Sequence, residues 1–148
     1  MKREWTGDAA QEAQQQKMAI ERLREYFKGR EPSYYITTLG CQMNAHDSEK
    51  LAGILAEIGF TESVKEEEAD LVVYNTCCIR DLAERKAYAA IGMAREIKAK
   101  NGGMVGVFGC MTQQTGAAQE LMRRMPFIDF AFGTHQLHRL PEFIHAAQ

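Results

Sequence analysis

Residues 71–78 of this chain are LVVYNTCC, an apolar run that passes directly into two polar residues and two cysteines. A continuous apolar run of this length is typical of a strand that is buried on both faces of a parallel sheet. Farther on, Asp81 and Glu84 form a capping box, and a narrow stripe of alanine and isoleucine at helical spacing follows them. The stretch therefore predicts a strand, a loop that carries Cys77 and Cys78, and a helix.

A similar order of elements precedes and follows this unit. Cys41 comes soon after a segment rich in β-forming residues, and Cys110 comes soon after another apolar run. The other expected strands cover residues 34–38, 104–108 and 127–132, and a last helix is expected near residues 140–147. Repeated alternation of strand and helix predicts an α/β, three-layer Rossmann-like domain whose mostly parallel sheet has four to five strands.

The first 32 residues differ from the rest and predict an N-terminal helical arm. Ile20, Leu23 and Phe27 lie on one face of a helix expected over residues 8–28. This face predicts either a helix that packs on the domain or one that binds a partner, and we favour packing because apolar stripes usually serve burial. The expected domain boundaries are therefore 1–32 for the arm and 33–148 for the α/β domain.

Composition limits the classes of function. The chain has 148 residues, of which 45% are hydrophobic and 26% charged, and a formal net charge of -2. This charge gives no general attraction to nucleic acids or anionic membranes. No secretory signal and no uncharged apolar run of membrane-spanning length is present, so we expect a cytoplasmic protein with reduced thiols and no membrane partner.

The positions of three cysteines carry most of the functional information. Cys41, Cys77 and Cys110 are 36 and 33 positions apart, and each follows a predicted strand. Because the carboxyl ends of parallel strands share one edge of the sheet, where ligands bind in such folds, these thiols are expected to converge. Gly40 and Gly109 precede two of them, as suits a backbone that turns sharply or approaches a ligand closely.

Several kinds of site can use three converging thiolates. Structural zinc usually takes four ligands in CxxC pairs, which this sequence lacks, and His46 is expected to have a surface or capping role. An iron–sulfur cluster normally takes four thiolates, so three would leave one iron open for another ligand. A nucleophilic thiol and simple burial of small side chains are further alternatives. We favour the cluster.

Short motifs around these cysteines resemble those of a known enzyme family. They are TLGCQMN at 38–44 with DSE at 47–49, NTC at 75–77 with IR at 79–80, GCM at 109–111, FGTH at 132–135, and LHRLPE at 137–142. Together they are similar to the N-terminal domain of the radical-SAM tRNA methylthiotransferases, over about residues 34–148. The QMN sequence after the first cysteine favours the tRNA branch over the branch that modifies a ribosomal protein. A small residue other than cysteine would be expected at position 78. Cys77 matches the motif, so we expect Cys78 to be a packed neighbour rather than a ligand.

The resemblance implies that Cys41, Cys77 and Cys110 hold an auxiliary 4Fe–4S cluster. Its open iron would carry the sulfur that is methylated and inserted at C2 of N6-isopentenyladenosine in tRNA, although a related branch acts on the threonylcarbamoyl-modified adenosine. The family's full-length enzymes also use a radical-SAM domain, in which a CxxxCxxC motif holds a second 4Fe–4S cluster and S-adenosylmethionine is cleaved. Their C-terminal domain binds the tRNA.

This sequence contains no CxxxCxxC motif. We therefore expect a fragment that lacks the radical-SAM and C-terminal RNA-binding domains, has no catalytic residue of its own, and is inactive alone. The tRNA, a sulfur donor and the radical-SAM domain would be partners within the full-length enzyme. The alternative function is a zinc-binding or metal-free Rossmann-like module that mediates protein interaction without catalysis.

Three polar residues near the cysteines are candidates to surround the cluster. Asn44, Asn75 and Arg80 carry amide or guanidinium donors, and such donors near cluster sulfurs hold the ligands and tune the reduction potential. Asn44 could instead cap the helix that follows Cys41, and Arg80 could be an ordinary surface cation.

Overall fold

The computed structural model describes residues 5–38, 42–76, 81–109 and 116–147, with side chains except at 5–10, 12, 42–44, 81–87, 134 and 135. The strands are β1 (Ser33–Thr38), β2 (Thr61–Glu62), β3 (Leu71–Thr76), β4 (Met104–Gly109) and β5 (Phe130–Phe132). The helices are α1 (Trp5–Tyr26), α2 (Gln42–Ile58), α3 (Asp81–Asn101), α4 (Ala117–Arg124) and α5 (Leu140–Ala147). Short 3₁₀ helices, η1 (Glu66–Glu68) and η3 (Thr134–Arg139), lie between them.

The five strands form one sheet in the order β2-β1-β3-β4-β5. Every strand pair in the described part of the chain is parallel. The register aligns the last residue of β1 with the next-to-last residue of β3, and the last residue of β3 with the last residue of β4. The strand order reverses between β1 and β3, because the chain first moves outward to β2 and then returns. The predicted α/β class with a parallel sheet of four to five strands is confirmed.

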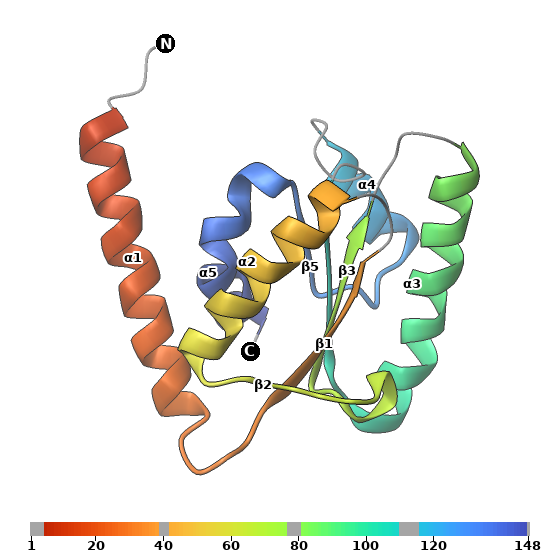
Figure 1. Cartoon of the computed structure of the whole chain (residues 1–148), viewed down its shortest axis with the longest axis horizontal. Coiled ribbons are helices and arrows are strands. Elements are labelled where there is room, and N and C mark those ends of the chain that lie inside the picture. The colour runs from red at the N-terminus through yellow and green to blue at the C-terminus, as the bar shows by residue number, and fades with distance from the viewer. Residues whose placement is uncertain (1–4, 39–41, 77–80, 110–115, 148) are drawn as a thin grey trace.

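Helices cover both faces of the sheet, which gives three layers. Figure 1 shows α1, α2 and α5 on one side and α3 and α4 on the other. Side chains of β3 alternate between these layers: Leu71 and Val73 join the first core cluster, whereas Val72 and Tyr74 join the second. All six residues of β3 are buried. This burial explains why residues 71–74 form an unbroken apolar run rather than an alternating pattern.

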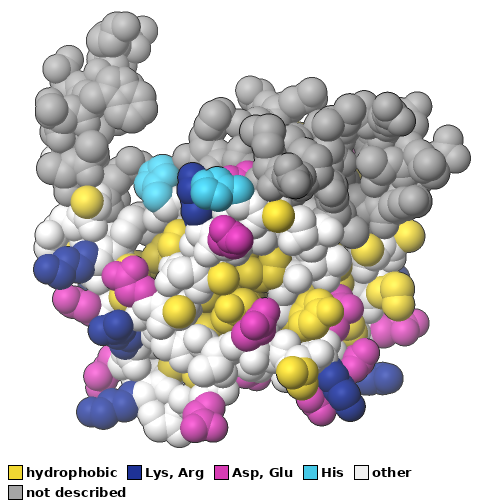
Figure 2. Space-filling model, in the orientation of Figure 1, with side chains coloured by type: hydrophobic (Ala, Val, Ile, Leu, Met, Phe, Trp, Pro, Cys, Tyr) yellow, Lys and Arg dark blue, Asp and Glu magenta, His cyan; other side chains and the backbone are white. Residues whose placement is uncertain are grey.

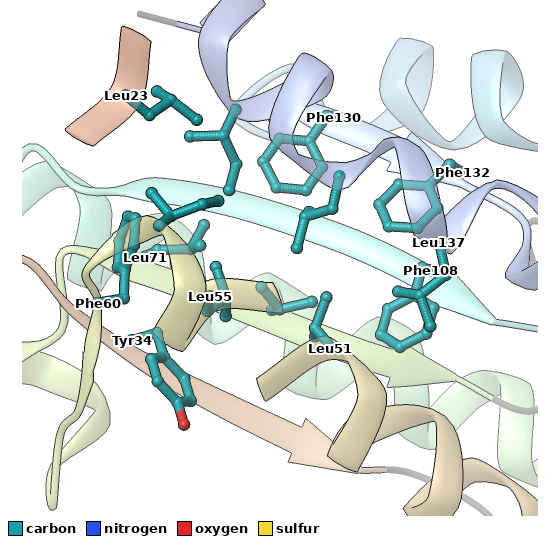
Figure 3. Close-up of a cluster of buried hydrophobic side chains, with 14 residues drawn as sticks. Leu23, Tyr34, Leu51, Leu55, Phe60, Leu71, Phe108, Phe130, Phe132 and Leu137 are labelled. Atoms are coloured by element: carbon teal, nitrogen blue, oxygen red, sulfur yellow. The ribbon is translucent and has the colours of Figure 1, made fainter. Parts of the chain in front are cut away.

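Aromatic side chains fill the first core next to β4 and β5 (Figure 3). The rings of Phe108 and Phe132 stack with centroids 5.4 Å apart. The ring of Phe130 lies over Gly106, where an added Cβ would be only 2.2 Å from a ring carbon. A glycine at this position of β4 is therefore what allows the ring to lie against the strand.

Helix α1 packs on the same core. Leu23 is fully buried, and Figure 3 shows it directed toward the cluster that Phe60 and Leu71 also enter. Gln16 binds α5 through two hydrogen bonds: its Nε2 donates to Glu142 Oε2 (3.2 Å) and its Oε1 accepts the Glu142 backbone N–H (3.3 Å). The packing interpretation of the N-terminal stripe therefore holds for the described residues, whereas the domain boundary at residue 33 stays a prediction.

The structure corrects the expected start of one helix. Helix α2 begins at Gln42, so Asn44 is its third residue and not the capping residue before it. The expected start rested on the residue type of Asn44, since asparagine commonly caps helices, whereas the helical backbone already begins two positions earlier. The helix start was therefore placed too late.

A second correction concerns the strands. No strand was expected between residues 38 and 71, but Thr61 and Glu62 form β2, which pairs with β1 through Ser33 and Tyr34. Both residues of β2 are exposed, so they carry no apolar signal. β5 is also shorter than expected and starts at Phe130 rather than at residue 127.

Charged side chains of both signs are interspersed on the described surface in Figure 2. This distribution agrees with the small net charge. None of the described helices combines the length and the apolar character that crossing a membrane requires.

Candidate metal centre

The carboxyl ends of β1, β3 and β4 lie at one edge of the sheet. Thr38 of β1 pairs with Asn75 of β3, and Thr76 of β3 pairs with Gly109 of β4. In an open parallel sheet, ligands bind outside this edge, above all where the strand order reverses. That reversal occurs between β1 and β3. The described strands thus form the shared carboxyl edge at which the cysteines are predicted to converge, and the reversal of strand order there is a feature that the structure adds.

The predicted ligands themselves fall outside the described residues. These are Cys41, Cys77 and Cys110, together with Cys78 and Arg80. The side chain of Asn44 is also outside the description. Their roles therefore stay predictions. Sequence connectivity still relates the ligands to the described edge, since Cys77 directly follows Thr76 and Cys110 directly follows Gly109.

A small polar network closes this edge between β1 and β3. Ser48, on the second turn of α2, places its Oγ 2.7 Å from Thr38 Oγ1 and accepts a hydrogen bond of 2.9 Å from Asn75 Nδ2. Asn75 is fully buried. Buried amides are normally hydrogen-bonded, and the Ser48 hydroxyl meets part of that requirement. One hydroxyl on α2 therefore links the ends of two neighbouring strands.

Between β3 and β4 the edge is closed by backbone contact. Thr76 Oγ1 donates to the carbonyl oxygen of Phe108 (3.2 Å). Gly109 has a φ of 122°, and an added Cβ would lie 2.3 Å from Thr76 O and 3.0 Å from Asn75 Oδ1. Only glycine adopts this conformation at little cost, and only glycine leaves room for the neighbouring backbone. The residue before Cys110 is thus a close-approach glycine, as the sequence predicted.

The chemistry of the described edge suits a thiolate-ligated group. Thr38, Ser48, Asn75 and Thr76 are polar but uncharged, and their hydroxyl and amide groups make the hydrogen bonds described above. His46, on the first turns of α2, has a side chain that is 68% exposed and lies 3.9 Å from Glu49, so its expected surface role is confirmed. Among the described residues, no group of three His, Cys, Asp or Glu side chains could hold a metal ion.

Ser48 is the site residue that sequence reasoning missed. It was noted only as part of the DSE motif, with no role of its own. A signal was nevertheless present, because Ser48 precedes the buried Leu51 by three residues and therefore continues the buried face of α2 by one turn. A hydroxyl on the buried face of a helix needs a partner, and the strand ends supply it.

Comparison with known proteins identifies the family. The sequence profile described as "Uncharacterized protein family UPF0004" matches residues 33–133, which span β1 to the end of β5. The chain belongs to this family. The matched region contains the three predicted ligands and the whole polar edge, so the family relationship covers the candidate site.

Curated relatives in this family carry the name tRNA-2-methylthio-N(6)-dimethylallyladenosine synthase. The chain is 46% identical over 126 residues to the protein of Alkaliphilus oremlandii, covering 84% of this chain and 27% of the relative. It is 50% identical over 115 residues to the protein of Carboxydothermus hydrogenoformans, covering 77% of this chain and 26% of that relative. The chain thus spans about a quarter of the length of these relatives. The resemblance to the N-terminal domain of the tRNA methylthiotransferases is confirmed.

Proposed function

We propose that this chain is the N-terminal, auxiliary-cluster domain of an enzyme that methylthiolates C2 of N6-isopentenyladenosine in tRNA. The observation that carries the proposal is the shared edge of β1, β3 and β4. Each of these three strands leads within three residues to one cysteine, and consecutive Cα atoms are only about 3.8 Å apart. The names of the relatives support the reaction and the tRNA substrate.

In this proposal Cys41, Cys77 and Cys110 bind three irons of a 4Fe–4S cluster as thiolates. When bound, the cluster supplies an open iron at which the sulfur to be transferred can be held. The protein's part is to orient the thiolates, and the side chains that the structure describes at the ends of β1 and β3 are uncharged and polar. Asn75 and Arg80 are proposed to donate hydrogen bonds near the cluster, as amides and guanidinium groups commonly do around sulfur ligands.

The remaining functions are assigned to parts of the protein beyond this chain. We propose that a radical-SAM domain with a second 4Fe–4S cluster cleaves S-adenosylmethionine, and that a C-terminal domain binds the tRNA. The net charge of -2 supports this division, because it gives the present domain little attraction for RNA. A cytoplasmic location and a separate sulfur donor complete the proposal.

Anaerobic reconstitution with iron and sulfide tests the cluster. We expect about four irons and four sulfides per chain, with broad absorbance near roughly 400 nm, as thiolate-ligated clusters show. Alanine at Cys41, Cys77 or Cys110 should each prevent stable assembly. The matched control is Cys78→Ala, which removes a neighbouring thiol and should leave assembly unchanged.

One outcome would overturn the proposal, and another would contradict its ligand assignment. If the chain takes up one equivalent of zinc in preference to a cluster, it is the zinc-binding module considered as the alternative. If Cys78→Ala abolishes assembly whereas Cys77→Ala does not, the ligand assignment is wrong, although the cluster would remain.

A further inference from the structure

A single serine connects the two strands at which the sheet reverses its order. Ser48 Oγ lies 2.7 Å from Thr38 Oγ1 and 2.9 Å from Asn75 Nδ2. Thr38 ends β1 and pairs with Asn75, the next-to-last residue of β3. The Ser48 hydroxyl on α2 therefore bridges the ends of these two strands. We call these three residues the Thr38–Ser48–Asn75 clasp.

The clasp lies where two of the proposed ligand loops begin. Cys41 is three residues beyond Thr38 in the sequence, and Cys77 is two residues beyond Asn75. The ends of the next strand pair, β3 and β4, are held together by the close approach of Gly109 to the backbone of Thr76. The clasp holds the ends of β1 and β3 together in a similar way, but through side chains rather than through backbone.

We propose that Ser48 is a positioning residue for the metal centre, which sets the separation of the chain segments that carry Cys41 and Cys77. The inference rests on the proposed function. A hydroxyl has one hydrogen to donate and two lone pairs, so it can accept the Asn75 N–H and still share a hydrogen bond with Thr38. Asn75 is fully buried and Ser48 is partly buried, so the Asn75–Ser48 hydrogen bond is partly shielded from competing water, whereas Thr38 at the end of β1 is exposed.

A purely structural role predicts different behaviour from a positioning role. If Ser48 only attaches α2 to the sheet, its loss would weaken folding and leave the bound cluster unchanged in the folded protein. If it positions the ligands, its loss would change how firmly the cluster is held even while the protein stays folded. Residues that orient metal ligands typically alter metal affinity by about 10- to 100-fold.

The test uses the 148-residue chain reconstituted anaerobically, with the metal-free chain measured in parallel. Ser48→Ala removes the bridge, and Ser48→Thr keeps a hydroxyl at the same position. Ser63→Ala is the matched control, because the Ser63 hydroxyl bonds locally to Lys65 on the β2–η1 connection. The readouts are the rate at which an iron chelator removes the cluster absorbance, the midpoint reduction potential, and the urea midpoint of the metal-free chain.

We expect Ser48→Ala to lose its cluster on the order of 10-fold faster than the wild type, with a shifted potential. Ser48→Thr should restore retention, and Ser63→Ala should match the wild type. Thr38→Val, of nearly the same shape, removes one half of the clasp without altering α2. It should accelerate cluster loss to a smaller extent, and it keeps the proposal testable if Ser48→Ala does not fold.

The inference is overturned if Ser48→Ala and Thr38→Val both retain the cluster and its potential as the wild type does. It is also overturned if Ser48→Thr loses the cluster as fast as Ser48→Ala, because the hydroxyl would then not be the active feature. If the wild-type chain assembles no cluster at all, the proposed function fails first, and the two failures are thereby distinguished.

Discussion

At the scale of single residues, Gly109 shows how closely the site depends on one missing side chain. Its φ of 122° lies where residues with a Cβ are strained, and a methyl group there would meet the backbone of Thr76 at 2.3 Å. The contact is with backbone, which cannot rotate aside as a flexible side chain can. The residue immediately before a proposed ligand is thus held in a conformation that only glycine adopts without strain.

Gly109→Ala is therefore expected to lower the free energy of unfolding by about 1–3 kcal/mol, the usual cost of such backbone strain. Urea unfolding of the metal-free chain measures it. The control is Gly53→Ala in α2, where nothing lies within 4 Å of the added Cβ. That change should stabilise the protein by about 0.5–1 kcal/mol, because alanine favours the helix. Equal stability of Gly109→Ala and wild type would contradict the strain argument.

At the scale of elements, α1 packs on the domain through a buried side chain and through hydrogen bonds to α5. Leu23 enters the first core cluster with no exposed surface. Gln16 and Arg139 both donate to Glu142 Oε2, at 3.2 and 3.1 Å. The helix lies before the region that the family profile matches, yet it contributes to the same core. We therefore expect α1 to contribute to the stability of the whole domain.

Leu23→Ala should lower the free energy of unfolding by about 2–5 kcal/mol, as removal of a fully buried leucine side chain usually does. Met18→Ala on the same helix is the control, since Met18 is 42% exposed. Its effect should stay within about 0.5 kcal/mol. A Leu23→Ala protein as stable as the control would mean that α1 does not pack on the core in solution.

The hydrogen bonds to Glu142 between α1 and α5 should also make the free energy of unfolding depend on pH. Hydrogen bonds from Arg139 first and Gln16 second hold the pKa of Glu142 below its ordinary value. A lowered folded-state pKa stabilises the protein above the unfolded pKa, and this contribution is lost as the pH falls through the folded pKa. Because the Glu142 side chain is 42% exposed, solvent screening limits it to about 1 kcal/mol or less.

Glu142→Gln should accordingly be less stable than the wild type at pH 7, and the difference should disappear on acidification. Urea unfolding of both proteins across the acidic range measures this difference. Other carboxylates titrate in both proteins alike, so they cancel in the comparison. A difference that grows as the pH falls would refute the assignment.

At the scale of the whole molecule, this chain contains a packed domain but only part of the proposed reaction machinery. It spans about a quarter of the length of its relatives, and its four cysteines include no CxxxCxxC set. The chain alone therefore lacks ligands for the second proposed cluster, at which S-adenosylmethionine would be cleaved.

The reconstituted chain, given S-adenosylmethionine, a reductant and isopentenylated tRNA, should form no methylthiolated nucleoside. Mass spectrometry of the digested tRNA detects the product, and a full-length relative provides the positive control. Product formed by the chain alone would show that the auxiliary-cluster domain suffices for the chemistry.

The sequence by itself determined the α/β class and the places of the longer elements. The run at residues 71–74 is apolar because β3 is covered on both faces, so its pattern required no knowledge of its neighbours. The order of strands and cysteines likewise predicted that three loops leave one edge of the sheet. These features are local, since each depends on residues close together along the chain.

Only the tertiary structure decided what has no local pattern. β2 exists because β1 offers it a parallel partner, and its two exposed residues carry no signal of their own. The close approach of Gly109 to Thr76 joins residues 33 positions apart, and the hydrogen bond of Asn75 to Ser48 joins residues 27 positions apart. Such contacts depend on which strands become neighbours, and packing of the whole chain sets that choice.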